Sequence, residues 1–462
     1  MSPESPWRLL ISTWSGRVGV SLLIAMVSIS ALVLLLMPLD FGTRYWNDPA
    51  HWVELPRAVP PEWQAWVTGS PYFPQTEVRL AKVSEDAGLV TYAARFRYDR
   101  DALPSHAVVV LRGLRFSGDP PTVAVDVYRP DGLRLPLARV SVPRPSPFEA
   151  PPYVRWSDQP LRVAPEGSQD FAAALRDWFA TAYRAELTSA SSRLAFAIPA
   201  PEGPAPLKGE YVFVARLFGS PGDGIDSVSV VLGGSHYGLV GTDVVGRDLF
   251  LGLLYGFPVA LGIGAFASVL VTSIGTLLGL LSGYYRGLLE EAIQRVADVI
   301  ANVPLLPILV FLSFLLRPNI LTIMAILVAF SWPGLAIVVR SMVLQVVEMP
   351  FVEAAKAGGA SDSRVILLHV LPQIAPYVAA QMVFFVPSAI LAEAGLSFLG
   401  LGDPTIPTWG QILELGFRTG AVFTGYWWWV IPPGILLMVT GVAFASLALG
   451  LEPLVNPRLR KI

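Results

Sequence analysis

The feature that most constrains this chain is a series of apolar runs, divided by one long charged region. An α-helix rises about 1.5 Å per residue, so about 20 apolar residues cross the hydrocarbon layer of a bilayer. Six runs approach that length, at residues 18–39, 259–283, 299–316, 320–339, 374–392 and 428–451. Only 15% of the 462 residues are charged, whereas soluble domains carry about 25%. The sequence therefore predicts a mainly α-helical integral membrane protein with six transmembrane helices.

Two of these runs allow more than one interpretation. The first could be a signal peptide, but it is longer than a usual signal core. Its end, Leu34-Leu35-Leu36-Met37-Pro38, offers no small-residue cleavage site, so an uncleaved anchor is favoured. The second belongs to an uncharged stretch at 249–285 that is too long for one crossing. Because Gly256-Phe257-Pro258 interrupts it, we expect a short interfacial helix up to Tyr255, followed by the crossing.

The positions of Lys and Arg predict the orientation, since these residues concentrate in cytoplasmic joints. With the N-terminus inside, the short outer joints hold only Arg317 and Arg418. The cytoplasmic segments then hold Arg8, Arg17, Arg286, Arg295, Arg340, Lys356, Arg364, Arg458, Arg460 and Lys461. We therefore expect both termini in the cytoplasm and the charged region outside it.

The charged region, residues 41–240, predicts an inserted β-rich extracytoplasmic domain. Alternating or β-branched runs at 107–111, 122–128, 211–217 and 227–232 are typical of strands, and a sandwich-like fold is expected. One helix is expected at 168–187, with Ser168 as its N-cap. The chain then divides into 1–40 (cytoplasmic segment and first helix), 41–240 (insert) and 241–462 (transmembrane core).

The insert shows no pattern of catalytic chemistry. The acidic pairs Asp99/Asp101 and Glu85/Asp86 are best interpreted as solvated loop charges, and the domain as a docking surface or a scaffold for a partner. The chain has no cysteine, and its four histidines are far apart, so no metal site is predicted. The net charge of −2 does not indicate a basic surface for binding nucleic acid.

The joint between the fourth and fifth runs, within 345–372, has a pattern that a simple connection does not need. It reads Glu353-Ala354-Ala355-Lys356-Ala357-Gly358-Gly359, and Leu371-Pro372 follows. The pattern predicts a short helix with a small-residue surface, broken by a glycine pair. Small side chains let another surface approach the backbone closely, and the charges of Glu353 and Lys356 flank that surface.

This segment resembles the "EAA" loop of bacterial ABC importer permeases, in which Glu-Ala-Ala precedes a glycine and, later, Leu-Pro. Glu353, Ala354, Ala355 and Gly359 stand at the corresponding positions. In that family the loop forms a coupling helix that seats in a groove of the ATPase subunit. The resemblance thus implies that Lys356, Gly358 and Pro372 also belong to an ATPase-coupling segment.

Two further segments resemble the dipeptide, oligopeptide and nickel branch of these permeases, and its C-type subunit. The first is Gly241-Thr242-Asp243-Val244-Val245-Gly246-Arg247-Asp248, ahead of the second crossing. The second runs from Glu393 through Leu396-Ser397-Phe398-Leu399-Gly400-Leu401-Gly402 to Trp409-Gly410. Family members usually join their first two helices by a short segment, so the long insert departs from the pattern.

The resemblance implies a permease subunit with the type I ABC importer fold in the cell inner membrane. It would form half of the pathway for peptides, nickel chelates or oligosaccharides, in contact with membrane lipid. The expected partners are a homologous second permease, two ABC ATPase subunits and an extracytoplasmic solute-binding protein. The chain has no GxxxxGK[ST] loop, so ATP and Mg²⁺ are expected on the ATPase and no cofactor is expected here.

Several roles remain open at the level of sequence. Asp243, Arg247 and Asp248 are expected to form a hydrogen-bonded cap on the second crossing rather than to contact cargo. Glu393 could pair with an arginine or line the pathway, and Ser397, Phe398 and Trp409 are further pathway candidates. The rival functions are an ion-coupled secondary transporter and a membrane-anchored scaffold with an outer binding domain.

Overall fold

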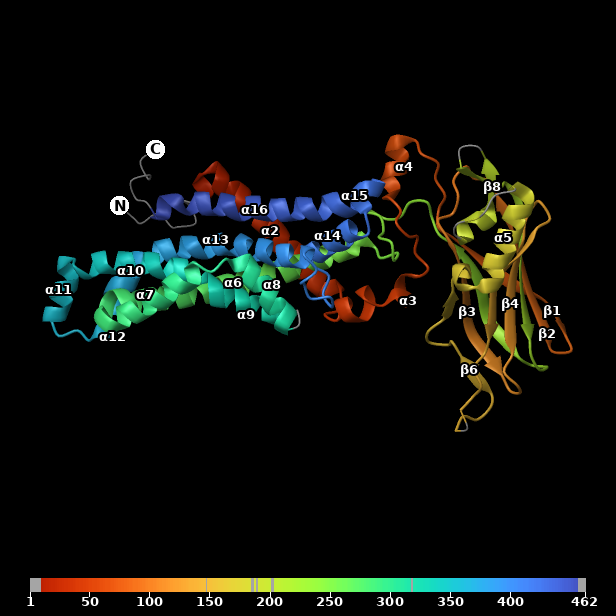
Figure 1. Cartoon of the computed structure of the whole chain (residues 1–462), viewed down its shortest axis with the longest axis horizontal. Coiled ribbons are helices and arrows are strands. Elements are labelled where there is room, and N and C mark those ends of the chain that lie inside the picture. Colours follow the sequence, from red (N-terminus) through yellow and green to blue (C-terminus); the bar gives the residue numbers. More distant parts are fainter. Residues whose placement is uncertain are drawn as a thin grey trace. The chain divides into compact units, whose positions relative to one another are not determined.

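The computed structural model describes residues 10–146, 148–183, 187, 190–200, 203–316 and 319–455. The chain forms two units: a helical unit made of Met1–Asn47 and Leu251–Ile462, and a sheet unit made of Asp48–Phe250. Figure 1 shows the helices of the first and the strands of the second. Five of the basic residues used to predict orientation, Arg8, Arg317, Arg458, Arg460 and Lys461, lie outside the described residues.

The helical unit contains twelve α-helices among its described residues. They are α2 (Trp14–Leu36), α6 (Leu249–Tyr285), α7 (Gly287–Ala301), α8 (Leu305–Leu316), α9 (Ile320–Ser331), α10 (Pro333–Val347), α11 (Pro350–Ala357), α12 (Asp362–Val365), α13 (Leu371–Phe398), α14 (Trp409–Arg418), α15 (Ala421–Thr424) and α16 (Trp427–Val455). Within the described ranges, five stretches are long and apolar enough to cross a membrane: Trp14–Leu36, Leu249–Tyr285, Ile320–Val347, Asp362–Phe398 and Trp427–Leu451.

The expected break at Gly256-Phe257-Pro258 is wrong. Helix α6 runs without interruption for 37 residues and contains Pro258 in its interior. An interior proline removes one backbone hydrogen bond and crowds the preceding turn. Here the indole N–H of Trp409 donates to the carbonyl oxygen of Leu253, at 2.9 Å, in that same part of the helix. A side chain of another helix thus satisfies a carbonyl near the proline, as is common in membrane helices.

The expected single helix over 299–316 is also wrong, because the chain breaks between α7 and α8. The side-chain amide of Asn302 donates to the Asp298 carbonyl oxygen (2.7 Å) at the end of α7, and Pro304 follows two residues later. A proline disfavours helical geometry in the residue before it. With 12 residues, α8 is about 18 Å long and does not cross a 30 Å layer alone.

Small residues bring the first and last long helices together. A Cβ on Gly19 of α2 would lie 2.5 Å from the backbone nitrogen of Leu447, and one on Gly450 of α16 would lie 2.7 Å from the Cα of Gly16. Only glycine permits such close backbone approach. Helix α16 packs in addition against α13 and α14.

The sheet unit confirms the prediction of a β-rich insert. Its strands are β1 (Thr76–Asp86), β2 (Leu89–Tyr98), β3 (Ala107–Phe116), β4 (Thr122–Tyr128), β5 (Arg134–Ser141), β6 (Tyr153–Arg155), β7 (Leu161–Val163), β8 (Ala197–Ala200), β9 (Gly203–Pro206), β10 (Gly209–Phe218) and β11 (Gly224–Leu232). Nine of them form one sheet in the order β5-β4-β10-β2-β1-β11-β3-β6, with β7 also on β3. Strands β8 and β9 form a separate hairpin.

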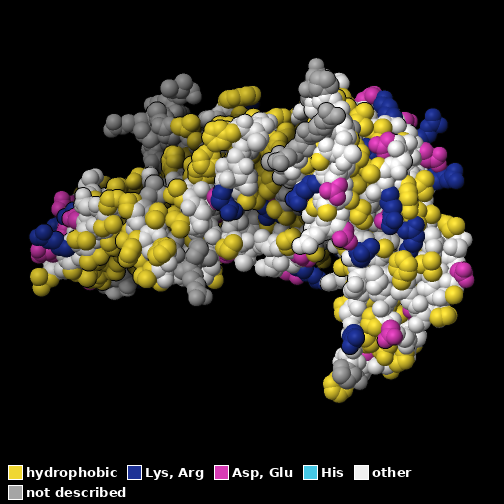
Figure 2. Space-filling model, turned by 45° about the vertical axis from the view of Figure 1, so that its right-hand side comes forward, with side chains coloured by type: hydrophobic (Ala, Val, Ile, Leu, Met, Phe, Trp, Pro, Cys, Tyr) yellow, Lys and Arg dark blue, Asp and Glu magenta, His cyan; other side chains and the backbone are white. Residues whose placement is uncertain are grey.

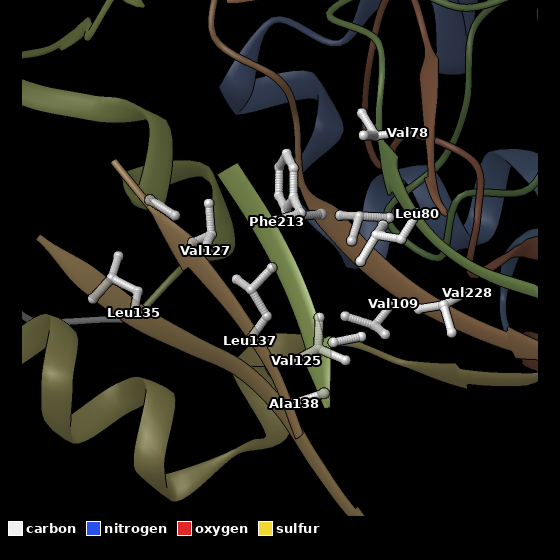
Figure 3. Close-up of a cluster of buried hydrophobic side chains, with 14 of the residues drawn as sticks. Val78, Leu80, Val109, Val125, Val127, Leu135, Leu137, Ala138, Phe213 and Val228 are labelled. Atoms are coloured by element: carbon white, nitrogen blue, oxygen red, sulfur yellow. The ribbon is translucent and has the colours of Figure 1, made fainter. Parts of the chain in front are cut away.

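One continuous sheet, rather than two stacked sheets, replaces the expected sandwich. Strand β1 joins the two halves, because Thr76–Leu80 pairs with β11 and Ala81–Asp86 pairs with β2, with a register shift between Lys82 and Ser84. Residues of both halves enter a single buried cluster. Figure 3 shows Val109 and Val228 of one half beside Val125 and Phe213 of the other. The sheet therefore curves around its own core.

Three helices accompany the sheet: α3 (Pro49–Trp52), α4 (Glu62–Thr68) and α5 (Gln169–Tyr183). The predicted helix at 168–187 is confirmed up to Tyr183, and residues 184–186 lie outside the described part. The Ser168 hydroxyl accepts from the Phe171 N–H (3.4 Å), as expected of an N-cap. Helix α5 buries Phe171 and Leu175 in the sheet core. Figure 2 shows mixed charges scattered over the sheet unit, whereas hydrophobic side chains cover most of the visible helical unit.

Candidate functional site

The Glu-Ala-Ala segment forms a helical elbow, defined here as residues 350–370, between α10 and α13. Helix α11 ends at Ala357, the chain turns through Gly358–Ser361, and α12 begins at Asp362. A π-helical turn, Ile366–Val370, then leads into α13. Pro372 occupies the first turn of α13, directly after the π-helical turn.

The elbow is held by buried aliphatic side chains. Val352, Val365 and Val370 are completely buried and pack in one cluster with Leu280 of α6 and Val343 of α10. One face of each short helix therefore lies against the longer helices. Because interiors are densely packed, a displacement of the elbow must move these neighbours as well.

The opposite face of α11 is exposed. Glu353 and Ala354 are exposed, Ala355 is half-buried, and Phe351 is 40% exposed. The Lys356 ammonium lies 4.8 Å from the centre of the Tyr284 ring at the end of α6. The elbow thus presents an exposed surface that includes small side chains, with the exposed Phe351 ring at one end.

Gly359 turns the chain between the two short helices. Its φ of +79° lies in the left-handed region, and no atom lies within 4 Å of an added Cβ. The glycine is therefore required by backbone conformation rather than by space. Gly358, in contrast, has an ordinary φ of −76°. The predicted coupling residues Glu353–Gly359 thus lie on the elbow, and Pro372 follows it in α13.

The Gly241–Asp248 segment folds as a closed loop around the Asp243 carboxylate, which belongs to the sheet unit. Asp243 is completely buried and accepts from the backbone N–H groups of Val245 and Arg247, both at 2.9 Å. It also accepts from the Arg247 guanidinium at 2.6 Å. The Thr242 hydroxyl, also buried, accepts from the Val59 N–H (3.2 Å). These contacts hold the loop together.

The end of this loop starts the second long helix. The Asp248 carboxylate accepts from the Phe250 N–H at 2.9 Å, which satisfies one of the free donors at the start of α6. Gly246 has a φ of +95°, and a Cβ there would lie 2.9 Å from the Trp52 carbonyl oxygen. In this geometry the segment acts as a cap and a fold support.

Glu393 is buried in α13 with a hydroxyl partner. It is 5% exposed, and the Ser397 hydroxyl, one turn later, donates to its carboxylate at 2.6 Å. Ser397 in turn accepts from the Thr408 hydroxyl at 3.5 Å. Among the ion pairs of the described residues, none involves Glu393. The arrangement ties α13 to the start of α14, where Thr408 is the N-cap.

Trp409 and Phe398 have different surroundings. Trp409 is buried and meets the Phe257 ring edge to face at 5.1 Å, in addition to its bond to Leu253. Phe398 is 40% exposed and lies 5.3 Å from the Phe417 ring. The structure therefore gives Trp409 a packing role, whereas Phe398 remains open on one side.

Sequence reasoning missed a glycine stripe on α6. Added Cβ atoms on Gly275, Gly279 and Gly283 would lie 3.0, 2.6 and 2.7 Å from Leu335, Val339 and Val343 of α10, respectively. Their spacing of four residues, visible in the sequence, is the small-xxx-small signal for close helix contact. The stripe connects α6 to the helix that leads into the elbow.

Asp403 was also missed. It is 7% exposed, and its carboxylate accepts from the Thr405 N–H (2.9 Å) and from the Ile320 N–H (3.0 Å) at the start of α9. The second contact joins positions 83 residues apart, so no local pattern could have predicted it.

Comparison with known proteins identifies the family. The protein family described as "binding-protein-dependent transport system inner membrane component" matches residues 275–461. The dipeptide transport system permease DppC of Bacillus subtilis is 35% identical over 222 residues, which cover 48% of this chain and 69% of that protein. The glutathione transport system permease GsiD of Pectobacterium atrosepticum is 32% identical, covering 48% and 73% respectively.

A second Bacillus subtilis relative, the oligopeptide transport system permease OppC, is 33% identical over 48% of this chain and 72% of its own length. The match to a solved chain of the MetNI methionine ABC transporter covers 42% of this chain and 92% of that one, at 18% identity and a TM-score of 0.32. On the similarity to these permeases, this chain belongs to the family of binding-protein-dependent transport system inner membrane components.

Proposed function

We propose that this chain is the C-type permease subunit of an ATP-driven peptide importer and forms half of its translocation pathway. The relatives named above are permeases for dipeptides, oligopeptides and glutathione. The observation that carries the proposal is the elbow, because it exposes Glu353 and Ala354 while its buried face is locked to α6 and α10.

In this proposal the exposed face of α11 seats against a separate ATPase subunit that holds ATP and Mg²⁺. Two such subunits, a homologous second permease and an extracytoplasmic solute-binding protein complete the assembly. Closure of the ATPases pushes on the elbow, and the packing of Val352 against Val343 and Leu280 passes the motion to α10 and α6. The pathway then alternates between outward- and inward-open states.

The proposed topology has six crossings, with both termini in the cytoplasm and the sheet unit outside. Support for the sixth comes from α7 and α8 taken together, since α7 packs against α10 and α8 packs against α9. The Arg340 guanidinium donates to Glu290 at 2.6 Å, joining α10 to α7. A broken helix of this kind is tolerated where neighbouring helices cover the break.

The decisive experiment reconstitutes this chain with the proposed ATPases, sister permease and solute-binding protein. ATP-dependent peptide uptake into proteoliposomes is expected. Ala354→Leu should abolish uptake or assembly, because the larger side chain would meet the docked ATPase. Ala173→Leu, at an exposed position of α5, is the matched control and should transport normally.

Normal uptake by Ala354→Leu would contradict the coupling role. Uptake by this chain alone, lost when an ion gradient is removed, would instead show a secondary transporter. Association with a surface partner in the absence of any uptake by the complete assembly would show a scaffold.

A further inference from the structure

Helix α13 of the helical unit is covered on one side and open on another. On the covered side, a Cβ added to Gly264 of α6 would lie 2.7 Å from the Val386 side chain and 2.9 Å from that of Ile390. The open side carries five residues spaced by three, four, three and seven positions, so they share one side of the helix. We call these residues the α13 face: Gln381, Phe384, Ser388, Leu391 and Phe398.

The α13 face is exposed and carries no charge. Phe384, Leu391 and Phe398 are 45%, 50% and 40% exposed. Ser388 is exposed and Gln381 is half-buried. Between positions 373 and 398 the sequence has one charged side chain, Glu393, which is buried. The face therefore offers two aromatic rings, an aliphatic chain, a hydroxyl and an amide.

This composition does not suit a surface that faces lipid. Helix α16 shows what such a surface looks like, because its exposed side has only apolar groups of 45% to 65% exposure, at Ile431, Ile435, Met438, Val442 and Leu449. The amide of Gln381 lies near the middle of the apolar stretch Asp362–Phe398. Polar groups at that depth are costly in hydrocarbon and usually face a protein interior or a water-filled cavity.

A hollow lies beside the α13 face at Ser388. Its volume is about 100 Å³, and the serines Ser268, Ser331 and Ser388 of three different helices contribute to its lining. One water molecule needs about 10–15 Å³ by this measure, so the hollow holds several. Close contacts between membrane helices use small residues, whereas the α13 face has two phenylalanines and a leucine. The surface is therefore better suited to a hydrated space than to tight packing against another helix.

The α13 face also has the length and the connection that a pathway requires. From Gln381 to Phe398 it covers 17 positions, or about 25 Å of the 30 Å hydrocarbon layer. One end of α13 follows directly on the π-helical turn of the elbow. At the other end, the Phe398 ring lies 5.3 Å from the Phe417 ring of α14. A displacement of the elbow therefore acts directly on the helix that carries this face.

We propose that the α13 face lines the translocation pathway and contacts the transported peptide. Gln381 and Ser388 hydrogen-bond the peptide backbone, and Phe384 and Phe398 contact apolar side chains. Because backbone amides are common to all peptides and the face has no charge, this surface does not select peptides by their charge. The inference rests on the proposed function as a peptide importer and assigns the surface that the cargo meets.

The chain has no cysteine, so a single introduced thiol reports its own surroundings. The test places Ser388→Cys or Gln381→Cys in the complete assembly in proteoliposomes, with partner subunits freed of cysteine. A water-soluble methanethiosulfonate reagent is then added, which reacts with thiolates formed in water. Met438→Cys on α16 is the matched control, since Met438 is 65% exposed on the apolar side of that helix.

We expect both α13 thiols to react during ATP turnover and the Met438→Cys thiol to remain unmodified. The reaction should abolish ATP-dependent uptake of a pool of short peptides, and an excess of the same peptides should slow the reaction. Modification without loss of uptake would overturn the proposal. A Met438→Cys thiol as reactive as the α13 thiols would overturn it too, because reactivity would then not report a pathway.

The remaining outcomes identify another occupant of the α13 face. Thiols that are unreactive in the assembly but reactive in this chain alone would show that the sister permease covers the face. Thiols that are unreactive in both would show that lipid covers it. Either result overturns the inference and leaves the proposed function intact if the untreated assembly still imports peptides. Absence of ATP-dependent uptake by the assembly with the unmodified chain would instead overturn the proposed function itself.

Discussion

The hydroxyl of Tyr284, in the last turn of α6, donates a 2.7 Å hydrogen bond to the carboxylate of Asp362, in the first turn of α12. The two residues are 78 positions apart, and their contact closes the elbow onto a membrane helix. The nearby Lys356 ammonium lies over the same ring. A single tyrosine therefore contacts both short helices of the elbow.

Tyr284→Phe should loosen the elbow without unfolding the chain. The ring and its contact with Lys356 remain, and the lost hydrogen bond to a charged group is worth about 1 kcal/mol at this exposed carboxylate. We expect faster amide hydrogen exchange over residues 350–370. Tyr285→Phe is the control, because Tyr285 is 49% exposed; equal acceleration in both variants would contradict this role.

Gly359→Ala should lower uptake per ATP hydrolysed by more than its loss of thermal stability explains. Placing alanine in the left-handed region costs about 1–2 kcal/mol. Gly420, at φ +78° and also with open space around an added Cβ, carries the same constraint outside the elbow. Both variants should lose similar thermal stability, but only Gly359→Ala should lower uptake per ATP hydrolysed. A parallel loss of uptake in the two variants would argue against a specific role of the elbow.

Gly279→Ala should separate α6 from α10. The new Cβ would lie 2.6 Å from the Val339 Cβ and 2.8 Å from the Ala336 carbonyl oxygen. Such overpacking costs about 1–3 kcal/mol and should lower the midpoint of thermal unfolding in detergent. Gly262→Ala, in open space on the same helix, should be neutral or gain up to about 1 kcal/mol from helix propensity. A Gly279→Ala chain as stable as the Gly262→Ala chain would refute the close contact.

Ser397→Ala should destabilise the junction of α13 and α14. It removes the Ser397 hydroxyl from the buried Glu393 carboxyl group and leaves the Thr408 hydroxyl as a remaining partner, so a loss of about 1 kcal/mol is expected. Ser388→Ala provides the control, since Ser388 is exposed and its hydroxyl donates to the Phe384 carbonyl oxygen of its own helix. Thermal unfolding of both variants measures the difference in stability. Equal unfolding midpoints would show that the hydrogen bond from Ser397 to Glu393 does not stabilise the fold.

The sheet unit should lose stability in mild acid. Burial holds the pKa of His106 below its ordinary value of 6.5, although its hydrogen bond to the Val53 carbonyl oxygen opposes this. The unfolded chain therefore takes up the proton first, so stability falls as the pH drops below about 6.5, by at most about 1.4 kcal/mol per pH unit for one histidine.

Burial also lowers the pKa of His236, so both histidines act in the same direction. Hydrogen exchange of residues 76–232 at pH 7.5 and 5.5 measures the effect in the full chain. His106→Gln should reduce the pH dependence. An unchanged dependence in that variant would assign the effect to other groups.

Periodicity and composition predicted most of the architecture because they depend on local chemistry. Runs without charge identified the long helices, and alternating runs identified β3, β4, β10 and β11. The same logic failed at Pro258, where the Trp409 side chain satisfies the Leu253 carbonyl group. It failed also at Asn302–Pro304, where a run apolar enough for one helix is divided between α7 and α8.

The candidate site likewise combines local features, which the sequence predicted, with long-range contacts, which it did not predict. The Glu353–Gly359 pattern, with Leu371-Pro372 after it and a position between two apolar runs, marked the elbow in the sequence. The contacts that anchor the elbow, Tyr284 with Asp362 and Val352 with Val343, join distant parts of the chain. No local pattern contains them.

By itself, the sequence determined that this chain belongs in a membrane, that it carries a β-rich insert, and which segment resembles an ATPase-coupling loop. Those properties follow from hydrophobicity and from short motifs, which act over a few residues. Only the tertiary structure decided that the Asp243 carboxylate closes a capping loop, that Glu393 is partnered by Ser397, and that one face of α13 stays exposed. Each of these depends on which side of an element is already covered, and that is set by packing between segments remote in the chain.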